Sequence, residues 1–142
     1  MTQSDKPTAL VVDDDHFIRI NACVILEEAG FDCTEACDGD EAWRLVQDGV
    51  PNLTLLFTDV EMPGSINGFE LARLAAEHSP EIEIVVASGR VAPKDGDIPQ
   101  KATFIGKPFS AQIVHDHLRA KLPDEKKPDP LREPVSDSSS QG

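Results

Sequence analysis

TALVVDDDHF, residues 8–17, is an apolar run that ends in three consecutive carboxylates. The run from Ala9 to Val12 has the composition of a strand buried inside a sheet, where aliphatic and β-branched residues are favoured. Asp13, Asp14 and Asp15 follow it without a break. Because crowded like charges repel one another and contribute nothing to folding, these acids indicate a site that needs carboxylates.

The same strand-then-helix pattern repeats along the chain. After the first strand, Ile18, Ala22 and Ile25 recur at helical spacing until Gly30 ends the helix. Apolar runs predict strands at 9–13, 31–36, 52–59, 82–88 and 102–107, and helical patterns predict helices at 16–30, 39–49, 68–80 and 110–122. Strands that alternate with helices predict an α/β domain with a parallel sheet covered on both faces.

One strand-helix unit is weaker than the others. The segment RVAPKDGDIPQK, residues 90–101, lies between the last two predicted strands. Pro93, Gly96 and Pro99 disfavour a full-length regular helix, since proline removes a backbone donor and glycine costs conformational entropy. The sequence therefore predicts a short turn of helix or a loop there.

Both ends of the chain lack the apolar pattern. Residues 1–7 are predicted to be a disordered N-terminus, and residues 123–142, with four prolines and a serine run, a disordered C-terminal tail. One folded domain is expected over residues 8–122. A chain that ends near Leu122 is expected to fold like the whole, because the tail offers almost nothing apolar to bury.

Charge and cysteine content limit the classes of function. The formal net charge of −13 argues against binding to nucleic acid or to an anionic membrane, because the field of the protein repels phosphates. A cation or a basic partner surface suits it better. The 3 cysteines have no metal-ligand spacing, and neither a signal peptide nor a long apolar span occurs. The sequence therefore predicts reduced thiols and a cytoplasmic location.

Polar residues gather at the predicted strand ends. In an open parallel sheet the ligand crevice lies at the carboxyl ends of the strands. The residues expected there are Asp13 and Asp14 after the first strand, Asp59 after the third, Ser88 after the fourth and Lys107 after the fifth. Two carboxylates about 4 Å apart repel by about 4 kcal/mol at an effective dielectric of 20. A divalent cation with oxygen ligands, Mg²⁺, would relieve this repulsion, and protonation of one acid is the alternative.

With this ordered set of residues the chain resembles the receiver domain of two-component response regulators. The matching motifs are VVDDD, FTDVEMPG followed by NGFEL, VVASGR and FIGKPF, within residues 8–122. The resemblance implies a five-stranded parallel sheet of order 2-1-3-4-5, a flavodoxin-like (βα)₅ fold, here with a short or irregular fourth helix. One departure is the loop MPGSING, which is one residue longer than the common form.

The resemblance also implies a role for each matching residue. Asp59 is expected to be the phosphoacceptor. A Mg²⁺ ion would be held by oxygens of Asp13, Asp14 and Asp59 and by the backbone carbonyl of Glu61. Ser88 and Lys107 match the hydroxyl and lysine that contact the phosphoryl group, Pro108 matches a proline that follows a cis peptide, and Phe104 matches an aromatic switch residue that acts with Ser88. An alignment that places Ala87 at the hydroxyl position is the alternative.

The implied function is that of a stand-alone response regulator. It would take a phosphoryl group from a histidine kinase or a histidine phosphotransfer protein, would not be an enzyme beyond its own phosphorylation and dephosphorylation, and would signal to an unknown output protein as a monomer or weak dimer. Roles as a phosphorelay intermediate or a phosphate sink stay open. A haloacid-dehalogenase-type phosphohydrolase would need threonine at position 17, where Phe17 stands. His115 and His117 are expected on the surface, and His16 at the helix start rather than in the chemistry.

Overall fold

The computed structural model describes residues 6–90, 92–94 and 96–131. Its strands are β1 (Thr8–Val12), β2 (Asp32–Ala36), β3 (Leu53–Asp59), β4 (Glu83–Ser88) and β5 (Thr103–Gly106), and its α-helices are α1 (His16–Glu28), α2 (Gly39–Asp48), α3 (Gly68–His78) and α4 (Ala111–Lys121). All neighbouring strands pair in parallel, in the order β2-β1-β3-β4-β5. This order confirms the flavodoxin-like α/β fold that the sequence predicts.

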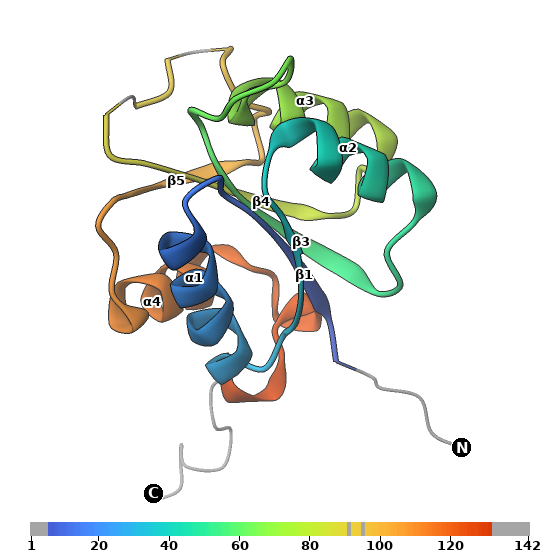
Figure 1. The fold of residues 1–142 in the computed structure, drawn as a ribbon. Helices are drawn as coiled ribbons and strands as arrows, with labels where there is room; N and C mark the ends of the chain where they lie inside the picture. Colours follow the sequence, from blue (N-terminus) through green and yellow to red (C-terminus); the bar gives the residue numbers. More distant parts are fainter. Residues whose placement is uncertain (1–5, 91, 95, 132–142) are drawn as a thin grey trace, which may run out of the picture.

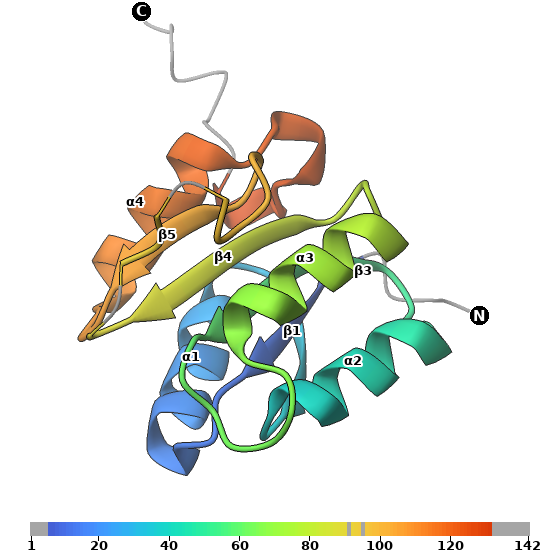
Figure 2. The same cartoon turned by 90° about the horizontal axis from the view of Figure 1, so that it is seen from above.

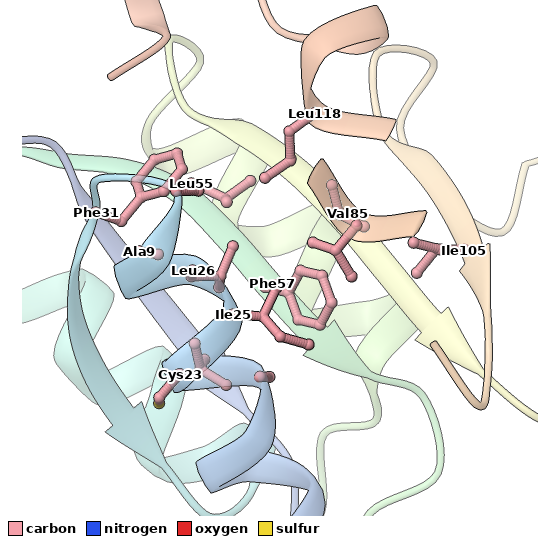
Figure 3. Packing of buried hydrophobic residues seen from close by; sticks show 14 of the residues in the cluster. Ala9, Cys23, Ile25, Leu26, Phe31, Leu55, Phe57, Val85, Ile105 and Leu118 are labelled. Atoms are coloured by element: carbon pink, nitrogen blue, oxygen red, sulfur yellow. The ribbon is translucent and has the colours of Figure 1, made fainter. Parts of the chain in front are cut away.

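The sheet separates two hydrophobic clusters, because successive side chains of a strand point to opposite faces. In β1, Ala9 and Val11 belong to the cluster under α1 and α4, whereas Leu10 and Val12 belong to the cluster under α2 and α3. Figures 1 and 2 show these two helix pairs on opposite faces of the sheet. Figure 3 shows part of the first cluster, in which side chains of α1, α4 and the sheet meet.

Each α-helix begins at a residue whose side chain accepts a hydrogen bond from a backbone N–H of the first turn. These caps are Asp15 for α1, Asp38 for α2, Asn67 for α3 and Ser110 for α4. A capped start satisfies N–H groups that have no partner within the helix. Because each helix follows a strand, the caps fix the loops at the carboxyl-end edge of the sheet. No helix in the described ranges has the length and apolar content needed to cross a membrane.

The segment between β4 and β5 forms no helix in its described residues, 89–90, 92–94 and 96–102. Its contacts are those of a loop. Lys94 N–H donates to the Asp97 carboxylate at 2.8 Å, Ala102 N–H donates to the Pro99 carbonyl at 3.0 Å, and Arg73 of α3 donates to the Asp97 carbonyl. The predicted irregular unit is therefore confirmed as a loop held to α3.

The chain beyond α4 differs from the prediction of a tail disordered from residue 123. Residues 123–131, here called the C-terminal strap, form two short 3₁₀ turns at Asp124–Lys126 and Asp129–Leu131. Leu131 is 1% exposed and belongs to the cluster under α1 and α4. The prediction was wrong for these residues, because one leucine anchors the strap in the core. Residues 132–142 and 1–5 of the two predicted disordered ends lie outside the described residues.

The strap crosses the amino-end edge of the sheet, at the lower end of the strands in Figure 1. Lys126 Nζ donates to the Glu83 carboxylate at 2.9 Å and also to the Glu81 carbonyl. Gly30, with φ of +107°, lies under the strap, and a Cβ added there would lie 2.7 Å from Pro128 Cβ. The absence of a side chain at residue 30 therefore lets the strap approach the end of α1.

Candidate functional site

Three carboxylates meet where β1 and β3 end. Val12 pairs with Thr58 in the sheet, so the next residues, Asp13 and Asp59, leave the two strands side by side. Oxygens of Asp13, Asp14 and Asp59 all lie within 4.8 Å of one another. Asp13 and Asp59 are buried, whereas Asp14 is exposed. The structure therefore brings together the three acids that the sequence singles out.

Lys107 lies directly against two of these acids. Its Nζ donates to Asp59 Oδ1 at 2.8 Å and to Asp13 Oδ2 at 2.9 Å. Burial lowers the pKa of Lys107, but the hydrogen bonds to Asp59 and Asp13 outweigh it, so the pKa stands above its usual value. The ammonium stays charged, and it supplies one positive charge against three carboxylates.

Burial raises the pKa of Asp59, and the charge of neighbouring Asp13 raises it further. The hydrogen bond from Lys107 opposes both effects. A carboxylate that is costly to ionise beside two other acids fits a site that needs more positive charge than one lysine provides. The three side-chain donors that meet here are carboxylates, whose oxygens are the hard ligands that Mg²⁺ prefers.

The loop after β3 is held close to Asp59 by glycine. Gly68 begins α3, and its N–H donates to the Val60 carbonyl at 2.8 Å. A Cβ added at Gly68 would lie 1.9 Å from the Asp59 carbonyl oxygen, a distance that no side chain tolerates. Asp40 of α2 accepts hydrogen bonds from the Ser65 backbone N–H at 3.0 Å and from the Ser65 hydroxyl at 2.7 Å. The longer loop is therefore tied to α2 and carries Glu61 at the same edge as Asp59.

Ser88 ends β4 beside the acids. Asp59 pairs with Ala87 in the sheet, and Ser88 is the next residue. Ala87 packs into the cluster under α1 and α4, whereas the Ser88 hydroxyl accepts a hydrogen bond from Arg90 N–H at 3.2 Å. Ser88 is thus the residue that brings a hydroxyl to this edge, which favours it over the alternative alignment at Ala87.

Beyond these strand ends the edge has a charged rim and a half-buried aromatic. The Arg90 guanidinium lies 3.9 Å from the Glu61 carboxylate, and both side chains are exposed. Phe104 pairs with Val86 and packs, half-buried, against the cluster under α2 and α3. The metal contact of the Glu61 carbonyl and the switch role of Phe104 stay predictions.

The peptide bond between Lys107 and Pro108 is cis, as the sequence predicts. The chain then leads into a small cavity of about 240 Å³, lined by Ile18, Asn21, Lys107, Pro108 and Phe109. This cavity lies between the start of α1 and the lysine that contacts the acids. It gives the site an apolar neighbour on the α1 side.

The third acid, Asp15, has a different task from its neighbours. Its side chain accepts hydrogen bonds from the N–H groups of Phe17 at 2.9 Å and Ile18 at 3.1 Å, and its own N–H donates to Asp13 Oδ1 at 2.9 Å. Asp15 therefore caps α1 and orients Asp13. The three consecutive acids divide into two that face the site and one that begins the helix.

Sequence reasoning missed Arg19. Its Nη1 donates to the Asp13 carbonyl at 3.0 Å, and its Nε forms an ion pair with the Glu35 carboxylate at 2.8 Å. Its Nη2 lies 3.1 Å from His16 Nδ1, so His16 contacts the guanidinium at the helix start. The guanidinium thus fixes the loop that carries the acids. The available signal was the position of Arg19, one helical turn after the cap.

The two histidines of α4, predicted to lie on the surface, each contact a neighbouring element. His115 Nε2 lies 2.8 Å from the Ile25 carbonyl oxygen, and His117 Nε2 lies 2.8 Å from Thr103 Oγ1. Both rings are half-buried. They join α4 to α1 and to β5, and they take no part in the acidic site.

The comparisons with known proteins agree with this geometry. A family model described as the response regulator receiver domain matches residues 9–119. The chain belongs to this family. Over 116 residues this receiver domain is 35% identical to the response regulator receiver protein CpdR of Brucella abortus (strain 2308), and the match covers 80% of this chain and 94% of CpdR.

Solved receiver structures share the fold. A response regulator receiver protein from Sinorhizobium medicae WSM419 matches with a TM-score of 0.73 and 25% identity, over 78% of this chain and 89% of that one. The response regulator protein TrrA of Thermotoga maritima, solved in complex with Mg²⁺ and BeF, matches with a TM-score of 0.68 and 26% identity, over 82% of this chain and 99% of that one.

Proposed function

We propose that this receiver domain accepts a phosphoryl group on Asp59 from a histidine kinase or a histidine phosphotransfer protein. The observation that carries the proposal is the buried carboxylate of Asp59, 2.8 Å from the Lys107 ammonium and beside Asp13 and Asp14. A carboxylate is a competent nucleophile toward phosphorus when nearby cations stabilise the transferring group. The chain would act in the cytoplasm, as a monomer or weak dimer.

The residues of the site have complementary tasks in this transfer. An oxygen of Asp59 forms a bond to phosphorus while the bond from phosphorus to the donor nitrogen breaks, and the nitrogen keeps the electron pair. Lys107 is placed to bind an oxygen of the transferred group and Ser88 to donate its hydroxyl hydrogen to another. Asp59 needs no general base, because the reacting form is already the carboxylate.

The carboxylate set fits Mg²⁺. Asp13, Asp14, Asp59 and the Glu61 carbonyl would hold the ion, which supplies positive charge to the phosphoryl oxygens. Asp15 and Arg19 orient Asp13 through its carboxylate and its carbonyl, at 2.9 and 3.0 Å. These two contacts hold Asp13 in place beside Asp59 and Lys107.

We assign the docking of the phosphoryl donor to the α1 side of the site. The exposed large apolar side chains of the described chain lie on α1 and α4: Phe17, Ile20, Val24 and Ile113. Phe17, 82% exposed, follows the acids by only a few residues. Because a donor must bring its phosphohistidine to Asp59, it has to cover the surface next to the acids, and this apolar face adjoins it. Burying these side chains would favour the complex.

Output is proposed to occur by protein contact from the opposite side of the site. Movement of the Ser88 hydroxyl toward a phosphoryl group would free space that Phe104 can fill from its half-buried position, which would change the surface of β4, β5 and their connecting loop. The match covers 94% of CpdR, a response regulator receiver protein, and we propose that this chain signals in the same stand-alone form. A relay intermediate or a phosphate sink would use the same chemistry without this surface change.

Intact-mass measurement tests the proposed acceptor. The full chain is incubated with acetyl phosphate or phosphoramidate and Mg²⁺, and one added phosphoryl group is expected. The Asp59→Asn variant should gain none. Asp15→Asn is the matched control: it removes a neighbouring carboxylate outside the cluster, and asparagine still caps a helix, so labelling should persist. Equal labelling of Asp59→Asn and wild type would refute the proposal, as would labelling that is unaffected by removal of Mg²⁺ with a chelator.

A further inference from the structure

Two cysteines meet where α1 packs on β2. Cys23 lies on the buried face of α1 and is 6% exposed, and Figure 3 shows it within the cluster under α1 and α4. Cys33 is the second residue of β2 and packs, half-buried, against the same cluster. The Cys33 Sγ–H donates to the Cys23 carbonyl at 3.6 Å, so its sulfur already touches the backbone of Cys23.

The two thiols also lie close enough to affect each other's ionisation. The neighbouring Cys23 side chain and burial raise the pKa of Cys33. The thiolate is the nucleophilic form of cysteine, and Cys33, as the neighbour of Cys23, can resolve its oxidised form.

We infer that Cys23 and Cys33 are a peroxide-sensitive thiol pair that forms an intramolecular disulfide between α1 and β2. The Cys23 thiolate attacks one oxygen of hydrogen peroxide, the O–O bond breaks, and a sulfenic acid and one water result. The Cys33 sulfur then attacks the sulfenic sulfur, the S–O bond breaks, the S–S bond forms, and a second water leaves. The two thiols lose two electrons, and the peroxide gains them.

The proposed disulfide would restrain α1 close to the acids. The Arg19–Glu35 ion pair already links α1 to β2, and a disulfide between Cys23 and Cys33 would be a second link between these two elements. Arg19 in turn holds the Asp13 carbonyl. The modification leaves Asp13, Asp59 and Lys107 themselves unchanged, so it is independent of the proposed phosphoryl transfer and can be tested without it.

Cys37 provides a matched control within the same chain. It is exposed, and its thiol contacts the Glu41 carboxylate at 3.2 Å rather than a second sulfur. The hydrogen bond to Glu41 raises the pKa of Cys37, which lowers its nucleophilicity at neutral pH. If exposure alone decided which thiol is oxidised, Cys37 would react first. The proximity of Cys23 and Cys33 predicts instead that this buried pair is oxidised.

The experiment counts free thiols after oxidation. The reduced full chain is treated with hydrogen peroxide, quenched with catalase, unfolded and alkylated with a maleimide. Wild type has 3 cysteines, and the number of adducts should fall to about one, with a mass loss of two hydrogens that dithiothreitol reverses. Cys37→Ser should lose both adducts. Cys33→Val, which suits a strand, should form no intramolecular disulfide and should show no loss of two hydrogens, and Cys33→Ala repeats this test if the valine variant does not fold.

Peptide mapping without reductant should find the Cys23–Cys33 link, and the melting temperature of Cys37→Ser should rise on oxidation, because the crosslink restricts the unfolded chain. A link through Cys37, a disulfide between two chains, or a sulfinic acid at Cys23 without a link would overturn the inference. Wild type that keeps all its thiols in excess peroxide would overturn it as well.

Discussion

The carboxyl-end and amino-end edges of the sheet take their residues from different parts of the chain. At the carboxyl-end edge, residues that directly follow buried strands build the site: Asp13, Asp59, Ser88 and Lys107. At the amino-end edge, the C-terminal strap covers the sheet and contributes Leu131 to the core. The first edge carries the proposed phosphoryl-acceptor site, and the second carries contacts that stabilise the fold. The residues of the proposed site are positioned by the strands that they directly follow, whereas the strap is held by contacts between residues far apart in the sequence.

The largest effect is expected from Gly68→Ala at the carboxyl-end edge. The added Cβ would lie 1.9 Å from the Asp59 carbonyl oxygen, so the loop or the strand end must move. Overpacking of this kind costs about 3 kcal/mol. The urea concentration at the unfolding midpoint should fall, and phosphoryl labelling should decrease. Gly106→Ala is the control, since nothing lies within 4 Å of a Cβ added there. Equal losses in both variants would show that the close approach at Gly68 is unimportant.

Leu131→Ala tests the amino-end edge. Leu131 is 1% exposed, and truncation of a buried leucine costs about 3 kcal/mol in the free energy of unfolding. Phosphoryl labelling measured well below the melting temperature should match wild type, because the strap lies at the opposite edge. Ile113→Ala, at a site that is 49% exposed, should cost much less. A chain ended at Leu122 should lose at least as much stability as Leu131→Ala. If the truncated chain is as stable as wild type, the strap does not stabilise the fold.

Arg19→Gln should have an intermediate effect, again at the carboxyl-end edge. It removes a charged hydrogen bond to the Asp13 carbonyl and an ion pair with Glu35, contacts worth about 1–2 kcal/mol. The Mg²⁺ concentration for half-maximal labelling should rise several-fold, as should the dissociation constant for Mn²⁺ measured by spin resonance. Arg119→Gln breaks only an exposed pair with Asp116 and should change stability by less than about 0.5 kcal/mol. Unchanged metal affinity in Arg19→Gln would show that Arg19 does not orient Asp13 for metal binding.

The positions of most site residues could be predicted from the sequence, whereas the contacts of Arg19 and Leu131 could not. A polar residue that directly follows an apolar strand has its position fixed by the strand register, so Asp59 and Lys107 could be placed without coordinates. Arg19 could not, because a long side chain on a helix has several partners within reach. Leu131 stands alone among prolines and charges, and its burial follows only from the cavity that α1, α4 and the sheet leave for it.

The smallest effect is expected in the loop between β4 and β5. Hydrogen exchange is compared with and without a beryllofluoride mimic plus Mg²⁺, in wild type and in Ser88→Ala. Residues 90–104 should change their exchange in wild type and change less in Ser88→Ala, because few backbone hydrogen bonds hold the described residues of this loop. The strap, residues 123–131, should not change in any sample. Identical exchange of residues 90–104 in all samples, with the site occupied, would place output on another surface.

Locating the phosphoryl group is the most direct test of the site. An acyl phosphate on aspartate is reduced by borohydride to homoserine, so the phosphorylated chain is treated with borohydride, digested and sequenced by mass spectrometry. The account predicts homoserine at residue 59, with Asp13, Asp14 and Asp15 intact. Homoserine at residue 13 or 14, or a phosphoryl group found on His16 with Asp59 unchanged, would contradict it.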